Sequence, residues 1–177
     1  MSAGERGFRI RTADADDLDA IMAIEQASFA GSAWERETMR AEIASEWGRY
    51  LIAEAADADV VQPGDAGQGS DGSQAGDAAQ PGALGYAGLR AVGVEGDVQT
   101  IAVAAHARGR GIGRALLAEL LAEAGRRGVR ELFLEVRADN PVARSLYECV
   151  GFVEIGVRPR YYQPEDVDAV VMKRVQP

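Results

Sequence analysis

Apolar side chains alternate with polar ones along several short segments of this chain, and that period of two predicts β-strands. Phe8–Arg11 is the first such segment, where apolar and basic residues alternate. Further apolar, strand-like segments follow at intervals to the end of the chain. The predicted strands are Phe8–Arg11, Tyr50–Ala53, Leu84–Val92, Val98–Val103, Leu132–Val136, Phe152–Val157 and Ala169–Met172.

Apolar residues at helical spacing predict four amphipathic helices between these strands. Asp14 offers an N-cap for the first helix, and Asn140 followed by Pro141 provides the N-cap and first position of the fourth. Gly128 and Gly151 are natural stops for the third and fourth helices. The predicted helices cover approximately residues 15–29, 34–43, 112–127 and 141–150.

The third helix has the clearest division into an apolar and a charged face. We expect its inward residues to be Leu116, Leu117, Leu120, Leu121 and Ala124. We expect its outward residues to be Glu119, Glu123, Arg126 and Arg127. The order of elements is strand, two helices, three strands, helix, strand, helix and two strands, which is an α/β arrangement on a mixed sheet.

The 177 residues are predicted to form a single domain over residues 1–177. Between about residues 56 and 82 the chain consists mainly of Gly, Ala, Asp, Gln, Ser and Pro without periodicity. We interpret this stretch as a disordered insertion between two strands. It is not read as a linker between domains, because neither flank has enough apolar sequence for its own core.

Charge and composition remove several classes of function. The formal net charge is −9, which argues against direct nucleic-acid binding and weakly favours a cationic partner. No apolar run approaches the roughly 20 residues that span a bilayer, and the polar N-terminus resembles no signal peptide. The single Cys permits no internal disulfide, which fits a cytoplasmic location, and one His with one Cys makes an N/S metal site unlikely, so we expect no metal.

A glycine-rich loop follows the strand Val98–Val103 and opens the third helix. Gly109, Gly111 and Gly113 alternate with other residues there, so main-chain N–H groups can close around an anion. The unpaired N–H groups and the dipole at the start of the helix favour the same charge. Arg108, Arg110 and Arg114 add positive charge, and the segment therefore predicts a pyrophosphate site.

Two common phosphate-binding motifs do not fit this loop. A nucleotide-triphosphatase loop needs Gly-Lys-Ser/Thr, but Gly113 is followed by Arg114 and Ala115. The dinucleotide pattern G-x-G-x-x-G fails whether it is counted from Gly109 or from Gly111. The remaining pattern, R-x-x-G-x-G, resembles the coenzyme A loop of the GCN5-related N-acetyltransferase (GNAT) superfamily.

A second set of residues, Glu135, Asn140, Tyr147 and the pair Gly151-Phe152, resembles the next strand and helix of that superfamily. The resemblance is closest to the branch that acetylates the N-terminal alanine of small-subunit ribosomal protein 18. It implies a splayed mixed sheet of six to seven strands with about four helices, and acetyl-CoA as cosubstrate. It also implies that Glu135 accepts a proton and Tyr147 donates one. The implied cofactor contacts are Ile101, Ala102, Val103, Arg108, Gly109, Arg110, Gly111, Ile112, Gly113, Arg114 and Asn140.

The sequence departs from this branch in two places that lie nearer the acceptor than the cofactor. Ala33 stands before Trp34 where the branch usually has Pro, and the insertion is not a family feature. Arg158, Arg160, Tyr161 and Tyr162 resemble the branch and either shape the peptide entrance or form a solvated strand end. Trp34 likewise belongs either to a substrate groove or to packing under the second helix.

Acetyl transfer to an amine needs a proton acceptor, donors to the carbonyl oxygen and a proton for the departing thiolate. Glu135 lies on the strand face opposite Leu134 and Val136, and the resemblance gives the amide of Val103 as an oxyanion donor. The α-amine at a chain terminus has a pKa of about 7.7–8.0, against about 10.4 for the side chain of lysine. One ordinary carboxylate is better matched to an α-amine, which favours an N-terminal acceptor.

Structural roles compete with these assignments. Glu135 also fits a solvated strand face, Tyr147 also fits core packing, and Asn140 also fits a simple N-cap. His106 is expected to be a solvated loop residue. Cys149 projects about 200° from Tyr147 around the helix and is expected to be a core thiol, so that transfer is direct within a ternary complex.

The sequence thus predicts an enzyme that moves acetyl from acetyl-CoA to a protein N-terminal α-amine, with a small-subunit ribosomal protein as its partner. A second hypothesis keeps the chemistry and changes the acceptor to a small-molecule amine, another protein N-terminus or a lysine. A third is a non-catalytic acyl-CoA-binding module, which would lack the pair Glu135 and Tyr147.

Overall fold

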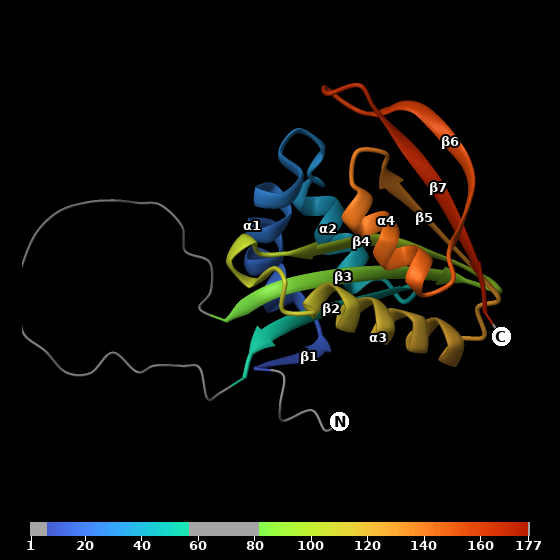
Figure 1. The fold of residues 1–177 in the computed structure, drawn as a ribbon. Helices are drawn as coiled ribbons and strands as arrows, with labels where there is room; N and C mark the ends of the chain where they lie inside the picture. The colour runs from blue at the N-terminus through green and yellow to red at the C-terminus, as the bar shows by residue number, and fades with distance from the viewer. Residues whose placement is uncertain (1–6, 57–81, 177) are drawn as a thin grey trace, which may run out of the picture.

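The computed structural model describes residues 7–56 and 82–176, which form one sheet covered by helices on both faces (Figure 1). The stretch that the sequence marks as an insertion, residues 56–82, lies almost wholly outside the described residues. Its two flanks meet at neighbouring strands, where the N–H of Ala55 donates to the carbonyl of Gly82 over 2.9 Å.

The sheet contains seven strands in the order β1-β2-β3-β4-β5-β7-β6. All neighbouring pairs are antiparallel except β4 and β5, which are parallel. The mixed sheet expected from the sequence is therefore confirmed. The strands are β1 Phe8–Thr12, β2 Gly48–Ala55, β3 Ala83–Val92, β4 Glu95–Val103, β5 Glu131–Arg137, β6 Val153–Tyr162 and β7 Val167–Val175.

The described residues contain the four expected α-helices, with small shifts at their ends. Asp14 caps a single 3-10 turn, Ala15–Asp17, that leads into the first α-helix. The second helix begins at Arg36, two residues later than expected, because the backbone of its N-cap residue Glu35 is still extended. The helices are α1 Leu18–Phe29, α2 Arg36–Ala44, α3 Ile112–Arg126 and α4 Pro141–Cys149. Among the described residues, no helix has both the length and the apolar character needed to cross a membrane.

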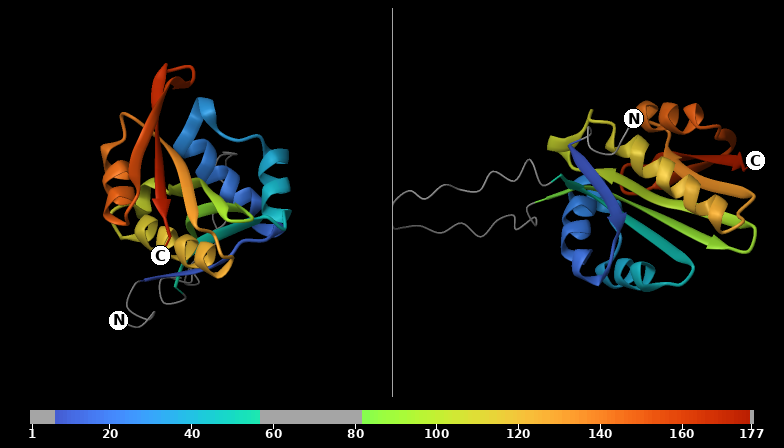
Figure 2. Two further views of the ribbon diagram at one scale, coloured as in Figure 1. Left: turned by 90° about the vertical axis from the view of Figure 1, so that its right-hand side faces the viewer. Right: turned by 90° about the horizontal axis from the view of Figure 1, so that it is seen from below.

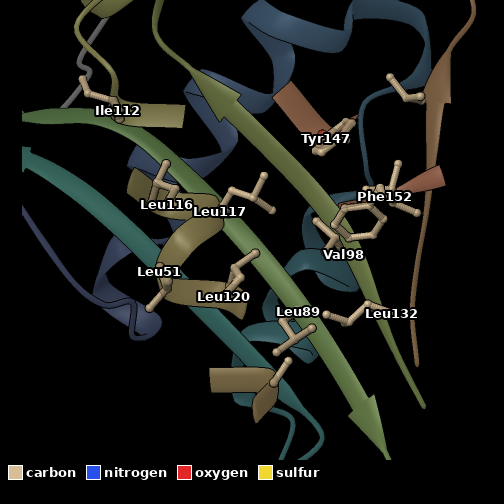
Figure 3. Packing of buried hydrophobic residues seen from close by; sticks show 14 of the residues in the cluster. Leu51, Leu89, Val98, Ile112, Leu116, Leu117, Leu120, Leu132, Tyr147 and Phe152 are labelled. Carbon is tan, nitrogen blue, oxygen red and sulfur yellow. The ribbon is translucent and has the colours of Figure 1, made fainter. Parts of the chain in front are cut away.

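Successive side chains of the central strands point to opposite faces of the sheet and belong to two separate hydrophobic cores. Leu51 and Ala53 of β2 belong to the larger core with α3, whereas Tyr50 and Ile52 belong to the smaller core with α1 and α2. Figure 2 shows α1 and α2 on one side of the sheet and α3 on the other. In the larger core, Leu116, Leu117 and Leu120 of α3 pack with side chains of the sheet and with Phe152, which precedes β6 (Figure 3). The sheet residues shown there include Leu51, Leu89, Val98 and Leu132.

The strands β4 and β5 pair only over their first three residues, from Glu95↔Glu131 to Asp97↔Phe133. Beyond that point β4 continues against β3 and β5 continues against β7, and the two diverge (Figure 1). The expected splay is confirmed. Among the described residues, it leaves one edge of Val98–Val103 without a ladder partner in the middle of the sheet, and a bound ligand can supply that partner.

Two expectations about side-chain direction were wrong. Glu123 was expected on the outer face of α3, but it is buried, with 6% exposed, because Arg49, Arg126 and Arg127 all bind its carboxylate. Cys149 was expected in the core, but it is exposed. Because only Tyr147 of the short helix α4 is buried, a residue about 200° away from it around the helix faces solvent.

Candidate active site

The loop between β4 and α3 combines a 3-10 turn, Ala105–Ala107, with two glycines in the left-handed conformation. Gly109 and Gly111 have φ angles of 77° and 79°, where L side chains are strained. Gly111 is also the N-cap of α3, and no side chain caps this helix. The N–H groups of the first helical turn therefore stay open for a ligand, and the dipole favours a negatively charged one.

Three exposed arginines lie in and beside this loop. The guanidinium of Arg108 donates from Nε to the carbonyl of Val103 over 3.2 Å, which ties the loop to the end of β4. Arg110 donates from Nη2 to the carbonyl of Gly7 over 3.3 Å. Arg114 is exposed in the first turn of α3. These contacts hold the loop in place and keep positive charge beside the N-terminus of α3.

A cavity of about 710 Å³ extends from this loop along the unpaired part of β4 to α4. Its lining brings together most of the residues that the sequence assigned to cofactor binding, while Arg110 and Arg114 lie outside it. The assigned residues that line it are Ile101, Ala102, Val103, Arg108, Gly109, Gly111, Ile112, Gly113 and Asn140. A diphosphate at the loop with an extended arm along β4 fits this shape and these donors.

A second cavity, of about 150 Å³, contains the predicted proton-transfer residues. Glu135 and Tyr147 both line it, together with Trp34 and Thr100. Ile101 and Tyr147 also line the larger cavity, so the two cavities adjoin where β4 and β5 diverge. The structure therefore places the candidate base and acid at one end of the proposed cofactor groove.

The carboxylate of Glu135 is partly exposed and carries an ion pair. Arg158 Nη1 lies 2.9 Å from Glu135 Oε1, and its guanidinium also lies over the ring of Tyr161, 5.6 Å from the centroid. Leu134 and Val136 are buried on the other face of β5, as the alternation predicted. The pair joins β5 to the edge strand β6 across β7, a contact for which the sequence carries no signal.

The phenol of Tyr147 is almost completely buried at the junction of the two cavities. Burial, with a smaller contribution from Tyr162, raises the pKa of Tyr147 to about 12. Its ring also packs edge-on against Phe152, with 5.9 Å between the centroids. The side chain of Tyr147 therefore packs in the core and keeps its hydroxyl proton at neutral pH.

Tyr162 is a second phenol in the smaller cavity. Burial raises its pKa to about 12, and the neighbouring Tyr161 and Glu135 act in the same direction. The guanidinium of Arg137 lies 5.4 Å from the centroid of its ring. The sequence left two alternatives for Tyr162, a peptide entrance and a solvated strand end, and in the structure the residue lines the smaller cavity.

Asn140 is the N-cap of α4, and it also lines both cavities. Its Oδ1 accepts the N–H of Ala143 over 3.0 Å, which caps α4. The cap uses the side-chain oxygen and leaves the amide NH₂ available to a ligand. His106 is exposed in the loop, as predicted.

Two charged residues that line the smaller cavity, Glu25 and Arg137, had no predicted role in the site. Glu25 lies on α1 and is only 1% exposed. It accepts hydrogen bonds from the main-chain N–H of Trp34 and from the hydroxyl of Tyr86. A signal was present, because Glu25 interrupts the apolar stripe of α1 at helical spacing from Ile21 and Phe29. A charged residue at a core-facing position requires buried partners.

Comparisons with known proteins agree with this geometry. Residues 18–152 match the acetyltransferase (GNAT) family. An uncharacterised protein of Mycobacterium leprae is 36% identical over 98% of this chain, and the N-alpha-acetyltransferase RimI of Mycobacterium tuberculosis is 47% identical over 51% of it. The crystal structure of the ribosomal-protein-S18-alanine N-acetyltransferase from Escherichia coli superposes with a TM-score of 0.73 and 30% identity, covering 95% of this chain and 93% of that one.

The matched regions amount to 42% of the length of the M. leprae relative and 58% of the M. tuberculosis relative. The match to the E. coli structure, in contrast, extends over nearly all of both chains. On the family match and these similarities, this chain belongs to the acetyltransferase (GNAT) family and resembles its RimI-like, ribosomal-protein-alanine branch.

Proposed function

We propose that this protein transfers acetyl from acetyl-CoA to the α-amine of a protein N-terminus. The observation that carries the proposal is the junction of the two cavities at the β4–β5 splay. The open N-terminus of α3 lies at one end of the larger cavity, and Glu135 and Tyr147 line the smaller cavity at the other end. One extended donor can thus span from a diphosphate site to a proton acceptor.

The donor is held mainly by main-chain groups. Ile112, Gly113 and Arg114 supply the open N–H groups of the first turn of α3, and Arg108 to Gly111 form the loop before them. The edge of Ile101–Val103 faces the splay and pairs with the amides of the extended arm. Asn140 contributes its free NH₂. Bound acetyl-CoA supplies the acetyl thioester, and the protein supplies position and proton transfer.

Glu135 accepts the proton of the acceptor ammonium, directly or through a water molecule. A single carboxylate is matched to an α-amine, because about a tenth of such amines are already neutral at pH 7. Tyr147 donates its proton to the departing sulfur, because its buried hydroxyl remains protonated throughout the neutral range. Tyr162 lies on the same wall and helps to shape the acceptor side.

Transfer is direct, without an acyl-enzyme. Cys149 is the single cysteine of the chain, and it is exposed on α4 and lines neither cavity. A thiol in that position has no contact with the junction of the cavities. Donor and acceptor must therefore be bound together when the acetyl group moves.

The acceptor class follows from the relatives. The M. tuberculosis protein is named an N-alpha-acetyltransferase, and the E. coli protein of the matching structure acts on the alanine of ribosomal protein S18. We infer that a small-subunit ribosomal protein with N-terminal alanine is the physiological acceptor here. We further propose that the enzyme acts in the cytoplasm, without a metal and without direct binding of nucleic acid.

The test uses the purified full chain with acetyl-CoA and a panel of acceptors. Peptides that begin with the N-terminus of ribosomal protein S18 are compared with the same peptides blocked at the α-amine but carrying a lysine, and with small amines such as spermidine. Turnover of the free α-amine peptides alone is expected. Turnover of only the small amines, or binding of acetyl-CoA with no transfer to any acceptor, would contradict the proposal.

A further inference from the structure

The buried carboxylate of Glu25 has no role in the chemistry proposed above. It is 1% exposed, lies on α1 and lines the same small cavity as Glu135. An ionisable group in such a place is costly unless its oxygens are bound. Both oxygens of Glu25 have donors, and these donors come from two other parts of the fold.

The first donor is the main-chain N–H of Trp34, which lies 2.9 Å from Glu25 Oε1. Trp34 stands in the segment between α1 and α2, two residues before α2 begins. Phe29, Ser32 and Trp34 all line the smaller cavity. This hydrogen bond, which Glu25 accepts, therefore fixes the main chain of a segment that lines the smaller cavity.

The second donor is the hydroxyl of Tyr86 on β3, which binds the other oxygen of Glu25. The same hydroxyl lies 3.1 Å from Thr100 Oγ1 on β4, in the unpaired part of that strand. Burial and the nearby charge of Glu25 raise the pKa of Tyr86, so the phenol keeps its proton and remains a donor. Glu25 is thus anchored to the sheet beneath the site.

The smaller cavity measures about 150 Å³. A cavity of about this volume accommodates one benzene-sized group. In the proposed reaction it must hold the acceptor amine and its first side chain next to the acetyl group. Little room remains for that side chain inside this cavity. Trp34 also lines a neighbouring cavity of about 530 Å³, which shares Glu135 and Tyr162 with the smaller one, so Trp34 lies where the two cavities meet. As long as Glu25 holds Trp34 there, the first side chain of the acceptor is confined to the smaller cavity.

We propose that Glu25, anchored by Tyr86, is a positioning residue that fixes Trp34 as a wall and thereby restricts the acceptor to peptides with a small first side chain. The inference rests on the proposed function, because it concerns the acceptor side of the same site. It assigns to Glu25 a hydrogen-bonding role and no part in proton transfer.

Two substitutions of Glu25 distinguish an effect of its hydrogen bonds from an effect of its negative charge. Glu25→Met has similar length but accepts no hydrogen bond from Trp34. Glu25→Gln keeps an amide oxygen for the N–H of Trp34 and offers its NH₂ to the oxygen of Tyr86. A matched control is Glu123→Gln, which alters a comparably buried carboxylate on α3 that lines neither cavity of the site.

The measurement is the ratio of kcat/KM for two peptides that differ only in their first residue, Ala or Leu. Wild type is expected to favour Ala strongly. Glu25→Met should lower the Ala:Leu ratio at least about fivefold, while Glu25→Gln and Glu123→Gln should keep it within about twofold. Trp34→Ala should lower the ratio as well. Tyr86→Phe, which removes one of the two anchors, should lower it by a smaller factor.

An unchanged ratio in Glu25→Met would overturn the inference. So would a Glu25→Gln variant that loses kcat equally for both peptides, since that result would make the carboxylate charge essential. If Glu25→Met does not fold, Tyr86→Phe decides, and an unchanged ratio there has the same consequence. Failure of wild type to acetylate either peptide would instead refute the proposed function itself.

Discussion

Arg158 on the edge strand β6 forms an ion pair with Glu135 on β5, with 2.9 Å between Nη1 and Oε1. The side chain of Arg158 is 55% exposed and that of Glu135 is 34% exposed. The guanidinium thus occupies an oxygen of the proposed base from the solvent side. An acceptor ammonium that approaches Glu135 must compete with it.

Replacement of Arg158 by Gln should therefore lower the KM for a peptide acceptor. Ion pairs at this degree of exposure are worth up to about 1 kcal/mol, so the decrease should not exceed about fivefold. The KM for acetyl-CoA should not change, because Arg158 lines neither cavity. Initial-rate kinetics with each substrate varied in turn provides the measurement. A rise in peptide KM would show that Arg158 contacts the acceptor instead.

Tyr147→Phe should lower kcat by about 10²-fold or more, because it removes the donor for the departing sulfur. The pKa of about 12 for Tyr147 means that the wild-type hydroxyl loses its proton only at very high pH. The wild-type rate should rise between about pH 6 and 8 as the α-amine loses its proton, and then stay level to about pH 10. A decline in wild-type kcat between pH 8 and 9 would argue against Tyr147 as the acid.

Gly111→Ala should raise the KM for acetyl-CoA about fivefold or more. The φ of 79° at Gly111 strains any residue with a Cβ by about 1 kcal/mol or more, and relief of the strain moves the loop. Gly128 is a matched control just beyond the other end of α3. Its φ is 75°, and a Cβ added at Gly128, like one added at Gly111, meets no atom within 4 Å.

Both glycine variants should lose a few degrees of Tm, as expected for about 1 kcal/mol in a chain of this size. Only Gly111→Ala should change the KM for acetyl-CoA. Equal effects of both variants on that KM would indicate that the loop acts through stability alone.

Glu123 should make stability depend on pH in the acid range. Burial alone would raise its pKa, but hydrogen bonds from Arg127, Arg126 and Arg49 outweigh burial and hold the pKa at about 2. A carboxyl whose pKa is lowered by folding stabilises the protein above its unfolded pKa of about 4.3, and that contribution is lost as the pH falls towards 2.

Glu123→Gln should accordingly reduce the free energy of unfolding by about 1–3 kcal/mol at pH 7, since charged hydrogen bonds are lost. The difference between variant and wild type should shrink steadily from pH 5 to pH 2. Urea unfolding at several pH values measures it. A difference that does not vary with pH would mean that the ion cluster contributes no charge-dependent stability.

The local pattern of the sequence was sufficient to predict the helices and strands and the glycine loop before α3. The alternation around Glu135 placed that residue on the correct face of β5, and the glycines before Ile112 gave the left-handed loop. Both depend on short-range rules, namely side-chain period and the conformational freedom of glycine.

Interactions between distant segments were not predictable in the same way. The burial of Glu123 depends on Arg49, which lies 74 residues away on β2. The pair of Arg158 with Glu135 depends on the order β5-β7-β6, which no local pattern specifies. Glu25 was detectable as a charge on an apolar stripe, but its partner Tyr86 lies 61 residues away in the chain.

The most direct test of Glu135 as the base is the effect of Glu135→Gln on turnover and on coenzyme binding in the same preparation. The amide cannot accept the proton of the acceptor ammonium, so kcat with an N-terminal alanine peptide should fall by about 10²- to 10⁴-fold. The dissociation constant for coenzyme A, measured by calorimetry, should stay within about twofold of wild type. Normal turnover by Glu135→Gln would contradict the assignment of Glu135 as the base at the β4–β5 splay.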